Sequence, residues 1–269
     1  MTKFHRELLE CNYCLNEENV PVWDVVDAEE DPDLVEKILL KELQTFVCSN
    51  CQRSYVIPRP FLLIDRPNKS LIYFEGREKE KMPESVPRQE DGSLLPELEE
   101  KLPHDFGFPT EDFSLRLVSD YNALIEKIHI ERAGLSDRLL EVLKLAMQTR
   151  LLDDDRQEFI KEKERAREEA TANPADEEAA ALHAELKDLA FDPLKAMEES
   201  SLLFLGKEGQ RLLFQRYSPY TGWRQLELQG KAYDQAEMLL SKRLPAEGRW
   251  EKIDREWAKI FAVKSGREI

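Results

Sequence analysis

Two short cysteine motifs constrain this chain more than any other feature of its sequence. All four cysteines fall in two Cys-x-x-Cys pairs, which read Cys11-Asn12-Tyr13-Cys14 and Cys48-Ser49-Asn50-Cys51. One such pair can bring two thiolates to the same side of a tight turn, and two pairs supply the four sulfur ligands of a tetrahedral Zn²⁺ site. We therefore expect Cys11, Cys14, Cys48 and Cys51 to bind a single zinc ion.

Energetics favour such a site wherever the four thiolates converge. Joining the two pairs closes the loop between them, which costs roughly 4 kcal/mol of chain entropy. A structural zinc site contributes roughly 10–16 kcal/mol in small peptides at neutral pH. Because four sulfurs leave no open position for water, we expect the zinc to be structural and not catalytic.

Two other interpretations of the cysteines stay open at this point. A redox Cys-x-x-Cys needs a helix N-terminus to lower a thiol pKa, and neither pair opens an expected helix. Four reduced cysteines buried without metal are the second alternative. His5 lies near the first pair in sequence, but a site with four sulfurs does not need it.

Charge separates the chain into an acidic body and a mildly basic tail. The formal net charge is −16, while residues 201–269 hold 13 basic and 9 acidic side chains. An acidic field disfavours a general binder of phosphate backbones. The charged N-terminus does not resemble a signal peptide and no apolar run reaches the length of a membrane span, so we expect a cytoplasmic protein.

Hydrophobic periodicity predicts alternating strands and helices around the cysteines. We expect strands at Val20–Val26, Thr45–Cys48, Ser54–Ile57, Phe61–Asp65, Ser70–Phe74 and Phe113–Val118. Helices are expected at 32–44, after Ser119 or Asp120 and after Ser136, the last two forming a helical hairpin. Between them, residues 77–110 form a proline-interrupted excursion with one helical turn at Pro96–Leu102.

Further along the chain, the pattern predicts a charged linker and a second small domain. Residues 153–176 are dominated by charge and are expected to be a solvated helical linker. After it we expect helices from Asn173 and Asp192, a hairpin of Ser201–Leu205 with Arg211–Tyr217, and a third strand at Trp223–Leu228. Two helices, Tyr233–Arg243 and Arg249–Ala262, are expected to end the chain.

The first half of the sequence resembles the CpXC domain, a bacterial and archaeal domain that is named for two Cys-Pro-x-Cys motifs and has no assigned function. The resemblance covers roughly residues 8–150. It rests on both cysteine pairs, the helix at Asp31–Leu43, the hairpin Phe61–Phe74 and the strand Leu115–Val118 with the following Asn122, Leu124 and Ile128.

Both motif prolines of that family are replaced in this chain. Asn12 and Ser49 stand where the family has proline, and Leu15 and Gln52 stand where a zinc knuckle often has glycine. Proline stiffens a turn, and glycine eases the left-handed backbone that lets amides donate to sulfur. We therefore expect zinc affinity to be lower than in a typical member.

One aromatic and basic cluster is a candidate contact surface for nucleic acid or a partner. It consists of Arg216, Tyr217, Tyr220, Trp223 and Arg224. Such a cluster can stack bases. The alternative is that its aromatic rings pack against neighbouring helices.

These observations predict an α+β fold with domains at 1–152 and 177–269, joined by the linker at 153–176. The first domain is expected to be a zinc-ribbon-like subdomain with a small antiparallel sheet and the helical hairpin, and the second to combine helices with a β-hairpin. We expect a non-catalytic, zinc-stapled module that engages a protein partner, with homo-oligomerisation also open. A zinc-ribbon protein associated with nucleic acid, and an enzyme whose site is assembled only in the fold, are the alternatives.

Overall fold

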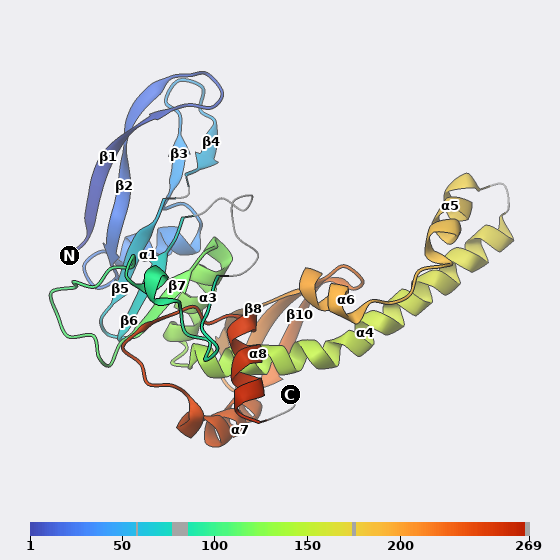
Figure 1. The fold of residues 1–269 in the computed structure, drawn as a ribbon. Helices are drawn as coiled ribbons and strands as arrows, with labels where there is room; N and C mark the ends of the chain where they lie inside the picture. The colour runs from blue at the N-terminus through green and yellow to red at the C-terminus, as the bar shows by residue number, and fades with distance from the viewer. Residues whose placement is uncertain (58, 77–85, 174–175, 267–269) are drawn as a thin grey trace. The chain divides into compact units, whose positions relative to one another are not determined.

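The chain folds into two compact units, seen in a computed structural model that describes all residues except 58, 77–85, 174–175 and 267–269. Unit 1 comprises Met1–Glu141 and Leu239–Glu268, and unit 2 comprises Val142–Met238. The first unit is therefore built from two separate pieces of chain. Figure 1 shows the elements and their labels.

A mixed six-stranded sheet forms the centre of the first unit, with the strand order β1-β2-β5-β6-β7-β11. Its strands are β1 (Lys3–Glu10), β2 (Glu17–Asp27), β5 (Phe61–Asp65), β6 (Ser70–Phe74), β7 (Ser114–Val118) and β11 (Trp250–Glu251). The pairs β1–β2 and β5–β6 are antiparallel, whereas β2–β5, β6–β7 and β7–β11 are parallel. The expectation of an antiparallel sheet was therefore wrong, because the Phe61–Phe74 hairpin joins parallel neighbours on both sides.

Alternate residues of the central strands belong to two hydrophobic cores, one on each face of the sheet. On one face, Leu63 and Ile72 pack with residues of α1 (Pro32–Leu39) and α3 (Tyr121–Arg132). On the other face, Leu62 and Leu71 pack with side chains of the 86–113 segment and with Trp250. Because successive side chains of a strand point to opposite faces, a hairpin buried on both sides has the continuous apolar runs seen in this sequence.

The proline-interrupted excursion provides the cover for the second face. Its described part, from Val86 onward, contains the short helix α2 (Pro96–Glu99) and buries Val86, Leu94 and Leu102. The single helical turn expected at Pro96–Leu102 is thus present, while residues 77–85 of the excursion lie outside the described residues.

Each cysteine pair occupies the tip of a β-hairpin. Cys11 and Cys14 lie between β1 and β2, and Cys48 and Cys51 lie between β3 (Thr45–Val47) and β4 (Ser54–Val56), which pair antiparallel. The strand β1 was not expected, because its charged sequence carries no apolar alternation. It is an edge strand with mostly exposed side chains, and such a strand needs little apolar content.

The C-terminal piece completes the first unit through a buried ion network. Arg116 of β7 and Arg138, near the start of α4 (Asp137–Ala172), are each about 2% exposed. Arg116 binds Asp137 at 2.9 Å and Glu247 at 3.0 Å, and Arg138 binds Glu251. Because buried charges need partners, the acids of residues 247–251 hold this segment against the rest of the first unit.

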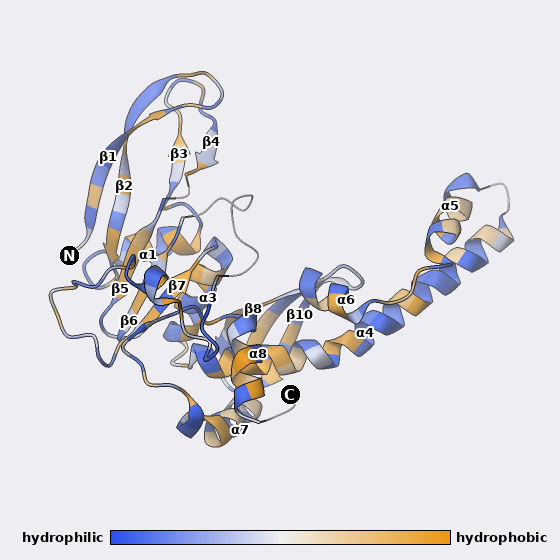
Figure 2. Ribbon diagram, viewed as in Figure 1, coloured by the Kyte–Doolittle hydropathy of each residue, from blue (hydrophilic) through white to orange (hydrophobic). Residues whose placement is uncertain are grey.

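The second unit contains a three-stranded antiparallel meander and most of α4. The meander runs β10-β9-β8, with β8 at Ser201–Glu208, β9 at Arg211–Ser218 and β10 at Gly222–Gln229. Helix α4 continues without a break to Ala172, and Figure 2 shows its second half mainly in hydrophilic colours. The helices α5 (Glu177–Leu186), α6 (Pro193–Glu199) and α7 (Gly230–Leu240) accompany them, and the short 3-10 helix η2 (Ser241–Arg243) follows α7 in the first unit.

One buried ion pair joins α4 to the meander. Asp155 is fully buried and accepts hydrogen bonds from Arg216, from the Ser218 hydroxyl at 2.7 Å and from the Thr221 hydroxyl at 3.2 Å. The charged stretch that begins at residue 153 therefore includes a core residue.

Several expected elements differ from the structure in length or type. Helix α1 ends at Leu39, before the expected 44, because Lys41 adopts a left-handed φ of 61°. The last helix, α8 (Arg255–Lys264), starts after Asp254 and not at Arg249. The helix expected at Arg249 was wrong because Trp250 pairs with Leu115 of β7, and a long-range pairing of two residues leaves no periodic pattern in the sequence.

The grouping into units also differs from the sequence-based division at 152 and 177, since residues 239–268 join the first unit. In the described parts of both units, every helix is too short or too polar to cross a lipid bilayer.

Candidate metal centre

The two cysteine turns share one backbone geometry. In the first, Leu15 N–H donates to the Cys11 carbonyl at 2.9 Å, and Cys11 N–H donates to the Asn16 carbonyl at 2.9 Å. In the second, Gln52 N–H donates to the Cys48 carbonyl at 2.9 Å, and Cys48 N–H donates to the Arg53 carbonyl at 3.0 Å. Each hairpin tip therefore folds back on its first cysteine and places the second cysteine beside it.

The residue after each pair adopts the left-handed conformation in which glycine is favoured. Leu15 has a φ of 60° and Gln52 a φ of 59°. A side chain in this region is strained by its own backbone, by roughly 1–2 kcal/mol for ordinary residues. Both turns thus adopt a left-handed residue after the second cysteine without the glycine that would be free of strain there.

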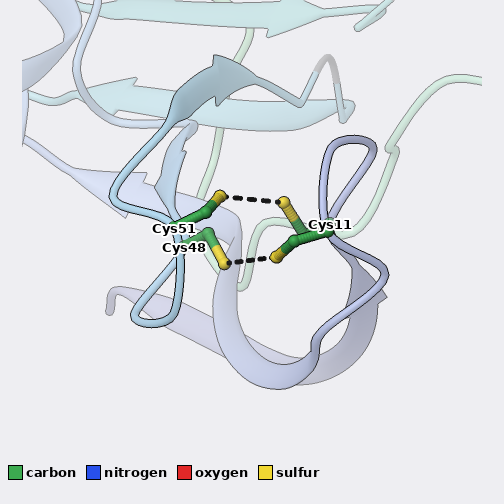
Figure 3. Close-up of side chains that lie close together, drawn as sticks. Cys11, Cys48 and Cys51 are labelled. Atoms are coloured by element: carbon green, nitrogen blue, oxygen red, sulfur yellow. Dashed lines mark hydrogen bonds between the residues drawn. The ribbon is translucent and has the colours of Figure 1, made fainter.

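All four sulfurs lie within 4.8 Å of one another. The Sγ atoms of Cys11 and Cys51 are 3.7 Å apart, and those of Cys14 and Cys48 are 3.6 Å apart. Figure 3 shows the labelled cysteines pointing toward one another from the two turns. Ligands about 2.3 Å from a tetrahedral zinc ion are separated from one another by about 3.8 Å, and the two shorter Sγ–Sγ distances are close to this separation.

These separations exclude disulfide bonds, whose sulfurs are about 2.05 Å apart, and all four cysteines are free. No pair opens a helix, which is where a redox thiol is activated. Within the described residues, these four are the one group of three or more His, Cys, Asp and Glu side chains placed to hold a metal ion.

A carboxylate fixes the second turn in place of the missing proline. One oxygen of Glu18 accepts from the Ser49 N–H at 2.8 Å, from the Ser49 hydroxyl at 2.9 Å and from the Asn16 side-chain amide at 2.8 Å. The N–H that proline would lack is therefore used as a tether between the two hairpins. The Ser49 N–H and hydroxyl hold the pKa of Glu18 below its usual value, which keeps the acceptor ionised.

Hydrogen bonds also prepare the sulfurs for metal. The backbone of Asn16 and then the side chain of Asn50 lower the pKa of Cys14 to about 6. The Cys48 sulfur accepts a hydrogen bond from the backbone N–H of Cys51, which lowers its pKa. Burial and the neighbouring thiols outweigh this effect and raise the pKa of Cys48 to about 12. A cation bound by the four sulfurs would displace the proton that the raised pKa favours on Cys48.

Aromatic packing joins the hairpins beneath the sulfurs. Phe46 is 4% exposed and packs with Cys11 and Cys48, and its ring lies 5.1 Å from that of Tyr55. The Tyr55 hydroxyl donates to the carbonyl of Glu10 across the hairpins at 3.0 Å. The turns are therefore held by a small core of their own, as well as by the sulfurs.

His5 takes no part in this cluster, because its Nδ1 lies 2.9 Å from Asp24 on the neighbouring strand. The residues that sequence reasoning missed are Glu18, Asn16 and Asn50. Their roles depend on the approach of two hairpins, and no local spacing signals it.

The aromatic and basic cluster of the second unit is split between environments. Arg216 is 2% exposed and pairs with Asp155, and the ring of Tyr220 packs 5.2 Å from that of Phe191. By contrast, Trp223 is 61% exposed and lies 5.1 Å from the Tyr217 ring on the adjacent strand, and Arg224 is exposed. The structure therefore does not bring the five residues onto one surface.

Comparison with known protein families matches residues 9–144 to the family described as CpXC protein. The matched segment contains both cysteine pairs, all of α1 and α3, and the strands from β2 to β7. No curated protein and no solved structure matches the chain.

Proposed function

Since the chain belongs to the CpXC family, we propose that its matched segment is a zinc-ribbon-like module in which one structural Zn²⁺ is bound by Cys11, Cys14, Cys48 and Cys51. The observation that carries this proposal is the cluster of four sulfurs within 4.8 Å, delivered by two hairpin tips of the same backbone geometry. Four thiolate ligands suit Zn²⁺ and leave no open coordination position. The proposed role of the metal is therefore to staple the hairpins, and the module is non-catalytic.

Metal analysis of the purified protein tests the staple. We expect about one zinc per chain after purification without chelator, and a cobalt-substituted form with the absorption of tetrahedral thiolate coordination. Cys48→Ser should lose the metal, whereas Ser54→Ala, a change on an adjacent exposed strand residue, should retain it. Protein that contains no zinc and does not take up zinc or cobalt would contradict the proposal.

We further propose that the stapled hairpins contact a protein partner. The hairpin region exposes six large apolar side chains, each more than half exposed: Phe4, Leu8, Tyr13, Leu15, Val47 and Val56. Clusters of exposed apolar side chains commonly mark interaction surfaces. A rigid metal-bound support lowers the entropy lost when such side chains are immobilised by a partner.

Quantitative capture from the native cell, compared between variants, tests this role. Leu8→Asp combined with Leu15→Asp should lose a partner that the unchanged protein captures. Val263→Asp serves as the matched control, because Val263 is 79% exposed and lies outside the hairpins. A set of captured proteins identical for all three forms would argue against contact through the hairpins.

The alternative of nucleic-acid binding has less support. It relied on the basic C-terminal third and on the aromatic cluster, but Arg216 is buried against Asp155 and only part of the cluster is exposed. If the alternative were true, binding to DNA or RNA would weaken steeply with salt.

A further inference from the structure

A hollow of about 500 Å³ lies beside α8 in the first unit. The aromatic side chains of Trp257 and Phe261 line it, together with the cations Arg243, Arg249 and Lys264 and the single carboxylate of Asp91. None of these residues belongs to the cysteine cluster, and only Asp91 lies within the matched family segment. Figure 1 shows α8 in red near the C-terminus.

Two parallel aromatic rings form the floor of the hollow. Trp257 and Phe261 are stacked, with ring centroids 5.1 Å apart and an angle of 8° between their planes. Trp257 is 2% exposed, and its N–H is capped by Asp254 at 3.0 Å. Asp254 is in turn bound by the largely buried Arg88 at 2.7 Å, so the start of α8 cannot move freely.

The cations around this floor are only weakly satisfied. Arg243 donates to the carbonyl of Ser265 at 3.2 Å, and Arg249 lies 3.8 Å from Asp91. Lys264 has no ion pair among the residues that the structure describes. Three positive charges therefore face one negative charge across the hollow.

This imbalance follows from how the C-terminal piece distributes its charges. Residues 239–268 contain eight Lys and Arg against five Asp and Glu. Three of the acids, Glu247, Glu251 and Asp254, are bound by arginines of the preceding core. Most carboxylates of this segment are therefore paired with arginines of the core. The surface at the hollow remains basic, although the net charge of the chain is −16.

We propose that this hollow is a binding site for a small organic phosphate that carries a flat ring, with the dimensions of a mononucleotide. Small-molecule sites commonly have volumes of about 300–1,000 Å³, an apolar lining and a few convergent polar groups. Arginine guanidinium groups bind phosphate oxygens in a bidentate manner, and lysine adds a point charge. A dianionic phosphate matches three cations better than a carboxylate does, and the Phe261 side of the aromatic floor accommodates a ring.

Calorimetric titration of the full-length protein with AMP tests this site, with adenosine, inorganic phosphate and ribose 5-phosphate as separate arms. We expect saturable binding of AMP, with adenosine and inorganic phosphate each weaker, because each retains only one part of the recognised group. Combined Arg249→Glu and Lys264→Glu should weaken AMP binding by about tenfold or more, a loss of at least about 1.4 kcal/mol.

Lys259→Glu is the matched control. Lys259 lies on the same helix and is exposed, but it does not line the hollow and pairs instead with Glu256. It should leave AMP binding within about twofold of the unchanged protein. If the double variant does not fold, Lys264→Gln alone, which removes a cation without an ion pair, provides the comparison.

Two results would overturn the site. One is the absence of saturable binding of any of the three phosphates up to about 1 mM, the weak end of specific recognition. The other is binding that the double variant weakens no more than Lys259→Glu does. Neither outcome depends on zinc, so the site and the metal staple stand or fall separately.

Discussion

At the scale of single residues, the two cysteine turns adopt their backbone geometry without the residue types that favour it. Leu15 and Gln52 occupy left-handed positions where glycine would be unstrained, and Ser49 replaces a proline. The Glu18 carboxylate binds the backbone N–H and hydroxyl of Ser49. The left-handed backbone is therefore present in spite of its strain. Hydrogen bonds from Ser49 to Glu18 hold the second turn where proline would stiffen it.

Glycine at the strained positions should tighten zinc binding. Leu15→Gly and Gln52→Gly should each favour the metal-bound form by roughly 0.5–1 kcal/mol, because relief of strain exceeds the entropic cost of glycine. Competition against a chelator would then show an affinity about two- to fivefold higher for each change.

Asn12→Gly is the control for this prediction. Asn12 lies in the same turn but has no left-handed φ, so glycine there should weaken binding slightly. Equal effects at Leu15 and Asn12 would show that backbone strain at Leu15 has no influence on the affinity.

Removal of the Glu18 carboxylate should weaken zinc binding without removing a ligand. Residues that orient metal ligands typically change affinity by about 10–100-fold, and Glu18→Ala should fall in that range. The same competition measurement checks it, with Glu17→Ala as control, because Glu17 is the exposed neighbour on the same strand. Equal zinc affinities for Glu18→Ala and Glu17→Ala would show that the Glu18 carboxylate does not support the site.

The convergence of the four cysteines could be predicted from the sequence, but the residues that support their turns could not. A Cys-x-x-Cys pair is a local motif, so the two pairs and their four sulfurs can be recognised in the sequence. Glu18 lies on one hairpin and Ser49 on the other, and their contact exists only once the two hairpin tips approach each other.

At the scale of elements, a protonatable contact joins α3 to β6. The fully buried hydroxyl of Ser70, at the start of β6, donates to Glu131 near the end of α3. Burial raises the pKa of Glu131 to about 8, against the lowering by the Ser70 hydrogen bond. Near neutral pH this carboxyl is therefore mainly protonated in the folded protein, whereas in the unfolded chain it is ionised.

Ionisation of Glu131 should lower the free energy of unfolding as pH rises. A carboxyl whose pKa is raised by folding stabilises fully below its unfolded pKa of about 4.5, and this contribution is lost as pH approaches 8. Glu131→Gln keeps a neutral hydrogen-bonding group. Relative to the unchanged protein, it should gain roughly 4 kcal/mol in unfolding free energy between pH 4.5 and 8.

Denaturant unfolding across this pH range measures the difference. Glu97→Gln, a change of an exposed carboxylate on α2, should follow the unchanged protein at every pH. Parallel curves for Glu131→Gln and the unchanged protein would contradict a raised pKa at Glu131.

Elements with a strong local pattern were predicted well, and elements created by distant partners were not. The strands of the Phe61–Phe74 hairpin have the expected bounds, because both are apolar throughout and flank a Pro-Asn turn. Trp250 was assigned to a helix, since its spacing to Ile253 and Trp257 fits a helical stripe. Its actual partner, Leu115, lies far away in sequence and gave no local signal.

At the scale of the whole molecule, the first unit needs a segment that lies beyond the family match. The match ends at residue 144, yet Arg116 and Arg138 are bound by Glu247 and Glu251, and Trp250 belongs to the second core. Domain boundaries drawn from sequence could not show this, because the returning piece has no motif.

A fragment of residues 1–144 should therefore fail to form a stable fold. It would leave Arg138 buried without its carboxylate, at a cost of roughly 3–5 kcal/mol, and it would expose the core that Trp250 covers. We expect no cooperative unfolding transition for the fragment by circular dichroism. Addition of a peptide of residues 239–269 should restore one, and a fragment that unfolds cooperatively alone would refute the prediction.

The return of the C-terminal piece has a consequence for how the protein is made. A ribosome releases the β1 to β7 region first, then the whole of the second unit, and only at the end the strand that completes the six-stranded sheet. The second unit can close while its predecessor still lacks Glu251 and Trp250. The first unit thus begins to be synthesised first but is completed last. Nascent chains stalled before residue 250 would expose the core that Trp250 covers to the cell's chaperones.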